Sequence, residues 1–216
     1  LIGSTDAVGG DNANTVKIIC CGGVFEFSFT ATAFTASGVT VTGTLGKTEY
    51  LVGDAFDPTG LVFTLVYDNG RTKLLSASDM TFGVDRFTVA GNDIAITAIY
   101  GDFTASGDIK VNVANRLTSI VVDMSGVVPP HSAGFVAGDR FDGTGIAVTA
   151  RYNEGIVGAT VVSEPVTDYT LDPADKTLVV GDNVFTVAYL GKTAEFTVTA
   201  IARAMTDFTV RRHSSI

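Results

Sequence analysis

A twelve-residue segment occurs twice in this 216-residue chain, and the spacing of the two copies limits the folds that the chain can adopt. The copies, at 50–61 and 135–146, both read aromatic-x-x-G-D-x-F-D-x-T-G-aliphatic and lie 85 residues apart. A period of this length is too long for a solenoid repeat and suits small domains that each have a core of their own. The repeat therefore predicts a series of similar small domains.

Further matches set the expected domain bounds. The segment 96–100 matches 185–189, and the segment 16–31 aligns with 185–200 at a constant offset of 169 residues. The domains expected from these matches are the late half of a preceding domain at 1–35, complete domains at 36–114 and 115–201, and at 202–216 either the first strand of a following domain or a donated strand. Because the chain starts at Leu1 within a domain, we expect it to be part of a longer array.

Alternation of apolar residues predicts strands along the whole chain, and no run has a helical period. Two sets of alternating residues follow the repeated segment at the same register: Leu61, Phe63, Leu65 and Tyr67, and Ile146, Val148, Ala150 and Tyr152. The first set is followed at once by Asn69-Gly70, a pair typical of hairpin turns because both residues tolerate positive φ. Many short strands separated by such turns predict an all-β chain of antiparallel sandwiches.

The repeated motif resembles a known family. The pattern Y-x-V-G-D-x-F-D-P-T-G-L begins at Tyr50, and Y-L-G-K-T-A-E-F-T-V-T begins at Tyr189. Together they resemble bacterial immunoglobulin-like domains, which occur in tandem arrays of surface proteins and are appended to phage virion proteins. The resemblance implies tandem immunoglobulin-like β-sandwiches and no catalytic residue. The second copy departs from the pattern at Gly143, where the first has Pro58, and has an insertion around 127–131; we expect neither to change the fold.

Composition excludes several function classes. There are 14 Lys and Arg against 23 Asp and Glu, which gives a formal charge of −9 and argues against a nucleic-acid partner. No apolar run is long enough to span a membrane. Cys20 and Cys21 are adjacent, so no intrachain disulfide framework is expected.

Four aspartates of the repeated motif are the candidates for a metal site: Asp54, Asp57, Asp139 and Asp142. Their carboxylates suit Ca²⁺, but full coordination needs six to eight oxygens, and no ladder of Asp ligands is present. An Asp that follows a Gly in a tight turn more often accepts backbone N–H bonds. We therefore predict turn chemistry at these positions, with no metal and no cofactor.

The remaining candidates for chemistry also favour structural roles. His131 and His213 lie outside the repeated segments and have no nucleophile in a recognised setting, so no catalytic residue is expected. Cys20 aligns with a core tyrosine, and Cys21 falls at a strand end. We assign to solvated surface three arginines, Arg203, Arg211 and Arg212. We assign to the core three phenylalanines, Phe25, Phe27 and Phe29.

These observations predict a non-enzymatic spacer or structural module of a bacterial extracellular or cell-surface assembly. Its partners would be neighbouring immunoglobulin-like domains of the same or an adjacent subunit. Three alternatives stay open: a decoration, tail or fibre module of a phage virion, an adhesin that binds carbohydrate or protein through loop tips, and an accessory module of a secreted glycosidase. The late half-domain at 1–35 would expose an apolar face that something must cover.

Overall fold

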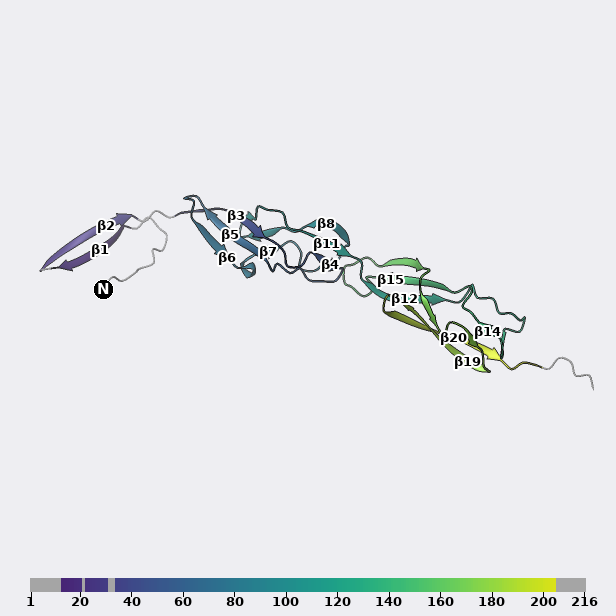
Figure 1. Cartoon of the computed structure of the whole chain (residues 1–216). Helices are drawn as coiled ribbons and strands as arrows, with labels where there is room; N and C mark the ends of the chain where they lie inside the picture. The colour runs from purple at the N-terminus through teal and green to yellow at the C-terminus, as the bar shows by residue number, and fades with distance from the viewer. Residues whose placement is uncertain (1–12, 21, 31–33, 205–216) are drawn as a thin grey trace, which may run out of the picture. The chain divides into compact units, whose positions relative to one another are not determined.

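The structure of the protein is a computed structural model that describes residues 13–20, 22–30 and 34–204 (Figure 1). Regular structure in this part of the chain is β, apart from one turn of 3-10 helix at Ala77–Asp79. No helix among the described residues has the length and hydrophobicity needed to cross a membrane. The all-β, antiparallel fold class predicted from the alternating pattern is confirmed.

By its own contacts the chain divides into two compact units, which are described separately. Unit 1 comprises Leu1–Tyr50, Ala55–Arg86 and Gly91–Asn112, and unit 2 comprises Leu51–Asp54, Phe87–Ala90 and Val113–Ile216. Two short segments, Leu51–Asp54 and Phe87–Ala90, therefore belong with the later part of the chain. The domain bounds expected from the repeat, and the tandem arrangement itself, stay a prediction.

The first two strands form a sheet of their own. β1 (Ala13–Cys20) and β2 (Gly23–Thr30) pair antiparallel, with Val16 opposite Phe27 and Ile18 opposite Phe25. Residues opposite each other in an antiparallel pair lie on the same face. The hairpin thus has one face on which Ile18, Phe25 and Phe27 lie together.

Unit 1 is built on a sheet whose central strand carries the first alternating set. Its order is β3 (Ala36–Gly43), β5 (Leu61–Tyr67), β6 (Thr72–Leu75). Two further sheets have three short strands each. One has the order β10 (Phe103–Thr104), β9 (Ala98–Tyr100), β7 (Thr81–Phe82). The other has the order β4 (Glu49–Leu51), β11 (Lys110–Ala114), β8 (Gly91–Ala95). Phe63 and Leu65 are buried, as predicted, whereas Leu61 and Tyr67 at the strand ends are half-buried.

Unit 2 repeats this plan, with a longer pair of late strands. Its first sheet has the order β12 (Leu117–Asp123), β15 (Ala147–Tyr152), β16 (Val162–Val166). The second sheet has the order β13 (Phe135–Val136), β20 (Lys192–Ile201), β19 (Gly181–Tyr189), β17 (Thr170–Asp172), and a small pair joins β14 (Arg140–Phe141) to β18 (Lys176–Thr177). Val148 and Ala150 of the second alternating set are buried, while Ile146 and Tyr152 are half-buried.

The core of unit 2 lies between its two larger sheets. One part gathers Ile120, Val148, Ala150, Val166 and Val187. The other gathers Phe141, Leu178, Phe185, Val198 and Ala200. Phe185 and Phe196 stack with centroids 5.3 Å apart and an interplanar angle of 9°, and an offset stack of this kind adds to the burial of both rings.

The glycine of the repeated T-G pair has a steric role in both units. A Cβ on Gly60 would overlap the carbonyl oxygen of Thr44, and Gly60 has φ +96°. In unit 2, a Cβ on Gly145 would overlap the carbonyl oxygen of Gly126, and Gly145 has φ +90°. Only glycine fits where two backbones approach this closely at positive φ.

One predicted strand is interrupted. The alternation of Ile94, Ile96, Ala98 and Tyr100 predicts a single strand, but β8 ends at Ala95 and β9 begins at Ala98. The backbone N–H of Ile96 donates to the carbonyl of Ile109 (2.8 Å), and β8 and β9 belong to different sheets. Because apolar alternation reports burial rather than the pairing partner, it does not reveal where a strand changes sheets.

Candidate functional site

A polar network of unit 2 surrounds Asn115 and Arg116, the two residues between β11 and β12. Asn153 follows β15 with φ +62° and is 3% exposed. Its backbone N–H donates to the carbonyl of Arg116 (2.8 Å), and its Oδ1 accepts from the N–H of Arg116 (2.9 Å). Its Nδ2 donates to Asn115 Oδ1 (2.8 Å) and to the carbonyl of Thr160 (3.1 Å). The buried amide thereby uses both donor hydrogens and its oxygen, as a buried polar group must.

Arg116 extends this network to the first copy of the repeated motif. Its Nε donates to the carbonyl of Val52 (2.8 Å), and its Nη2 donates to Asp54 Oδ1 (2.5 Å). The other carboxylate oxygen of Asp54 accepts from the N–H of Leu51 (3.1 Å). All of these residues belong to unit 2. Two directed bonds from one guanidinium fix the loop more tightly than a single point charge would.

Asp139 has the same place in the second copy of the motif. Its Oδ2 accepts from the N–H of Val136 (2.9 Å), while its Oδ1 lies 3.1 Å from His131 Nε2 and 3.4 Å from Arg203 Nη2. The hydrogen bond from Val136 is the main reason that the pKa of Asp139 is lowered, with His131 and Arg203 adding to the effect. Arg203 thus contacts Asp139 while its side chain stays 65% exposed, as expected for a residue assigned to solvated surface.

Asp57 and Asp142 each close a turn on the threonine two residues later. Asp57 Oδ1 accepts from the N–H and the hydroxyl of Thr59 (3.0 and 2.6 Å), and Asp142 Oδ1 accepts from the N–H of Thr144 (2.9 Å). The Thr59 hydroxyl bond chiefly lowers the pKa of Asp57, and the Thr144 backbone bond chiefly lowers that of Asp142. These are the bonds that the turn interpretation expects.

Nothing in the described part of the chain gathers three or more His, Cys, Asp or Glu side chains as a metal site would. The four candidate aspartates bond instead to backbone N–H groups, to Thr59, to Arg116, to His131 and to Arg203. Oxygens already held by cations and N–H groups are poorly suited to Ca²⁺. The expectation that the chain needs no metal stays a prediction.

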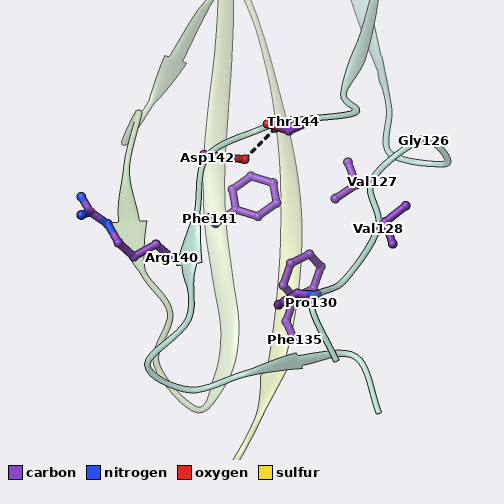
Figure 2. Close-up of a pocket in the computed structure, with 9 residues that line it drawn as sticks. All are labelled: Gly126, Val127, Val128, Pro130, Phe135, Arg140, Phe141, Asp142 and Thr144. Carbon is purple, nitrogen blue, oxygen red and sulfur yellow. Dashed lines mark hydrogen bonds between the residues drawn. The ribbon is translucent and has the colours of Figure 1, made fainter. Parts of the chain in front are cut away.

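A cavity of about 340 Å³ opens beside the insertion of unit 2 (Figure 2). Its lining residues are Gly126, Val127, Val128, Pro130, Phe135, Arg140, Phe141, Asp142 and Thr144. Phe141 is buried and packs on Phe135, with ring centroids 5.7 Å apart. Arg140 extends away from the two rings in Figure 2 and bonds to Asp175 (Nε to Oδ1, 2.8 Å). The two rings thus give the cavity an apolar wall, while Arg140, Asp142 and Thr144 contribute polar groups to its lining.

The other candidates are placed as follows. Cys20 ends β1 opposite Gly23, while Cys21, His213, Arg211 and Arg212 lie outside the described residues. His131 is exposed and has Asp139 as its neighbour. Phe25 and Phe27, which the sequence assigned to a core, are 59% and 56% exposed in this chain. Of the described candidates, His131 and Arg203 meet at Asp139, whereas Cys20 lies in β1 of unit 1.

Sequence reasoning missed the network around Asn153 and Arg116. A signal was available, because Arg116 and Arg203 each follow a late strand at nearly the repeat spacing, and each bonds to the motif aspartate of its own repeat. A second signal is Asp68, which has the same place in the first copy of the repeat as Asn153 has in the second. The N–H of Asp68 donates to the carbonyl of Thr35, and its carboxylate accepts from the N–H of Thr35. Asn153 makes the same two kinds of bond with Arg116.

Residues 43–113 match the family described as bacterial Ig-like domain (group 3). This match confirms, for that part of the chain, the resemblance seen in the motif, and it indicates a module of a bacterial surface or extracellular protein. The chain is also similar to pectate lyase L of Thermoclostridium stercorarium, with 27% identity over 177 residues. That similarity covers 76% of this chain but only 13% of the lyase.

Proposed function

We propose that the chain is a non-enzymatic structural module that spaces other parts of a bacterial surface or extracellular protein. The observation that carries the proposal is the network around Asn115 and Arg116. A two-residue connection whose amides and side chains bond to Asn153, Val52 and Asp54 is held in one conformation. A spacer needs such a connection, whereas a binding loop would leave polar groups available to a ligand.

Limited trypsinolysis tests whether this connection is held. The Arg116–Leu117 bond has to open locally before a protease can cleave it, so we expect cleavage there to be at least about tenfold slower than at the exposed turn residue Arg71. Asn153→Gly keeps a residue that accepts positive φ and removes only the side-chain bonds. This variant should raise the cleavage rate at Arg116.

The matched control is Asn69→Gly, since Asn69 also accepts a local backbone bond, from the N–H of Arg71, but lies in an exposed turn of unit 1. Asn69→Gly should leave cleavage at Arg116 unchanged. Equal cleavage of Arg116 and Arg71 in the unaltered chain would contradict the proposal.

A second candidate function is an accessory module of a secreted polysaccharide-degrading enzyme. The similarity to pectate lyase L favours it, because the small covered share of the lyase leaves room for a separate catalytic region. The cavity of unit 2, whose wall includes Phe135 and Phe141, is then the natural contact for the flat face of a sugar ring. Sedimentation of the chain with insoluble polygalacturonate tests this function, with Val128→Asp as the variant, since Val128 is 84% exposed at the cavity. Binding that Val128→Asp abolishes would favour the accessory role over the spacer.

A further inference from the structure

The outer face of the sheet formed by β3, β5 and β6 in unit 1 is built from uncharged side chains (Figure 1). Val39, Phe63 and Leu65 are buried on the inner face, so the alternate residues of these strands face outward. The register gives the outward residues as Gly38, Thr40, Thr42, Val62, Thr64, Val66, Thr72 and Leu74. Leu74 is 72% exposed, and Val62 is 45% exposed. We call this set of residues the unit 1 outer face.

The equivalent face of unit 2 carries charges. Its register places Arg151 at the position of Val66, and Asp123 at the position of Thr42. Charged side chains on an exposed sheet discourage other proteins from packing on it. The two units thus have the same sheet, and unit 1 lacks this protection at both positions.

The edge strands of the two sheets differ as well. Leu74 of β6 stands opposite Thr64, whereas Pro165 of β16 stands opposite Thr149, the counterpart of Thr64. A proline on an edge strand removes an N–H that another strand would use, and thereby protects the edge. β6 has instead Lys73, whose charge discourages strand addition at the edge. A partner of this sheet is therefore expected to cover its face rather than to extend it.

We infer that the unit 1 outer face is a contact between two copies of this chain, in which each copy covers the face of the other. Each copy has a formal charge of −9, so two copies repel each other and meet most favourably where neither is charged. A contact with twofold symmetry also needs a face that complements itself, and valine, leucine and threonine side chains pack on their own kind without opposing like charges. The equivalent face of unit 2 is a poorer partner, because the contact would bury Asp123 and Arg151 against uncharged groups.

The size of the face sets the expected strength of the contact. β5 has seven residues, which makes the face about 24 Å long, and three strands make it about 14 Å wide. Two such faces together cover about 700 Å², which is less than the roughly 1,000 Å² that a stable interface buries. We therefore expect a weak dimer with a dissociation constant on the order of 0.1–1 mM.

Sedimentation velocity of the 216-residue chain tests the inference, in a reducing buffer that keeps Cys20 and Cys21 from joining two chains. We expect the mean sedimentation coefficient to rise as the concentration increases from about 0.01 to about 1 mM. Leu74→Lys places a charge on the face and should weaken the association by at least about tenfold. Because Leu74 is exposed, this variant should unfold at the same temperature as the unaltered chain. A chain that stays monomeric at the highest concentration would overturn the inference.

Val121→Lys is the matched control. Val121 is 38% exposed on the equivalent face of unit 2, at the position of Thr40, and the substitution changes the net charge by the same amount. It should leave the association unchanged, and equal effects of the two substitutions would overturn the inference. The β1–β2 hairpin also exposes apolar side chains, among them Phe25 and Phe27. An association that Leu74→Lys leaves intact would have another origin, such as this hairpin, and would likewise overturn the inference.

The effect of salt gives a second, independent measurement. Raising the salt concentration from about 0.05 to about 0.5 M screens the repulsion between two acidic chains and does not affect contacts between uncharged side chains. The association should therefore be as strong or stronger at high salt. An association that salt weakens would depend on ion pairs between the copies and would contradict the assignment to this face.

Discussion

In unit 2 the late hairpin runs without a break through β19 and β20, whereas in unit 1 the equivalent chain is interrupted twice. The residues at the centre account for the difference. Phe185 stands opposite Phe196 and stacks on it in unit 2, and the equivalent residues in unit 1 are Ile96 and Gly107. A stacked aromatic pair requires adjacent, parallel side chains and so favours a continuous ladder.

Gly107 has the opposite effect. Its φ of +133° ends regular pairing, and a Cβ there would lie 2.6 Å from Val41 Cγ1. The chain before it, at Ser106, pairs with β3 instead: Ser106 N–H donates to the carbonyl of Val39 (2.8 Å), and Val41 N–H donates to the carbonyl of Ser106 (3.0 Å). The comparison shows that one repeat can close its sandwich by a long hairpin and another by a strand that changes partners.

The largest expected effect comes from the stack itself. Phe185→Ala should lower the stability of unit 2 by about 3–5 kcal/mol, since it removes a fully buried ring that neighbouring side chains cannot replace. Hydrogen exchange of the β19 amides measures this loss. The control is Val184→Ala on the exposed face of the same strand, for which a change within about 0.5 kcal/mol is expected. Equal effects would mean that the stack does not maintain the hairpin.

A smaller effect is expected at the interruption in unit 1. Gly107→Ala should destabilise unit 1 by about 1–3 kcal/mol, because the new methyl group meets Val41 in a closely packed region. Gly38→Ala is the matched substitution, since a Cβ at Gly38 meets nothing within 4 Å. Thermal unfolding of the two variants compares them, and a neutral Gly107→Ala would show that this part of unit 1 adjusts freely.

Smaller changes in stability are expected for the two arginines that bond to the motif aspartates, Arg116 and Arg203. Arg116→Lys is expected to cost about 0.5–1.5 kcal/mol, because an ammonium cannot reproduce the two directed bonds to Val52 and Asp54. Arg203→Lys should change stability by less than about 0.5 kcal/mol, since Arg203 makes one long contact of 3.4 Å with Asp139. Hydrogen exchange of the Asn153 backbone amide measures the effect of Arg116→Lys. A larger loss of stability for Arg203→Lys than for Arg116→Lys would contradict the prediction.

The smallest expected effect is a loss of stability at acidic pH. A carboxylate whose pKa is lowered in the folded state stabilises the protein above its unfolded pKa, and this contribution is lost as the pH falls through the folded pKa. Of the carboxylates with lowered pKa, Asp57 lies in unit 1, whereas Asp123, Asp139, Asp142 and Glu154 lie in unit 2. We therefore expect amide protection in unit 2 to fall more than in unit 1 between pH 5 and about pH 3. Asp142→Asn should reduce that difference, and an equal loss in both units would contradict the prediction.

The sequence predicted the β class, the buried residues of β5 and β15 and the turn bonds of Asp57 and Asp142, because alternation and Asx turns are local. It did not predict the network of Asn153 and Arg116, since the residues that complete it are separated by 37 to 64 positions along the chain. It also missed the strand interruption near Ile96, where the burial pattern continues while the hydrogen-bond partner changes. Burial patterns and turn bonds within a few residues could thus be predicted from the sequence, whereas the pairing of distant backbone segments could not.

The bridge between Thr40 and Ser106 in unit 1 is parallel, and it joins β3 to a late segment of the unit. When tension pulls an early strand and a late strand of one domain in opposite directions, parallel partners slide along each other. Their hydrogen bonds then bear the force together rather than opening one after another from an end. Under such tension, the two hydrogen bonds at Ser106, next to Gly107, would have to break together before β3 could separate from the late part of unit 1.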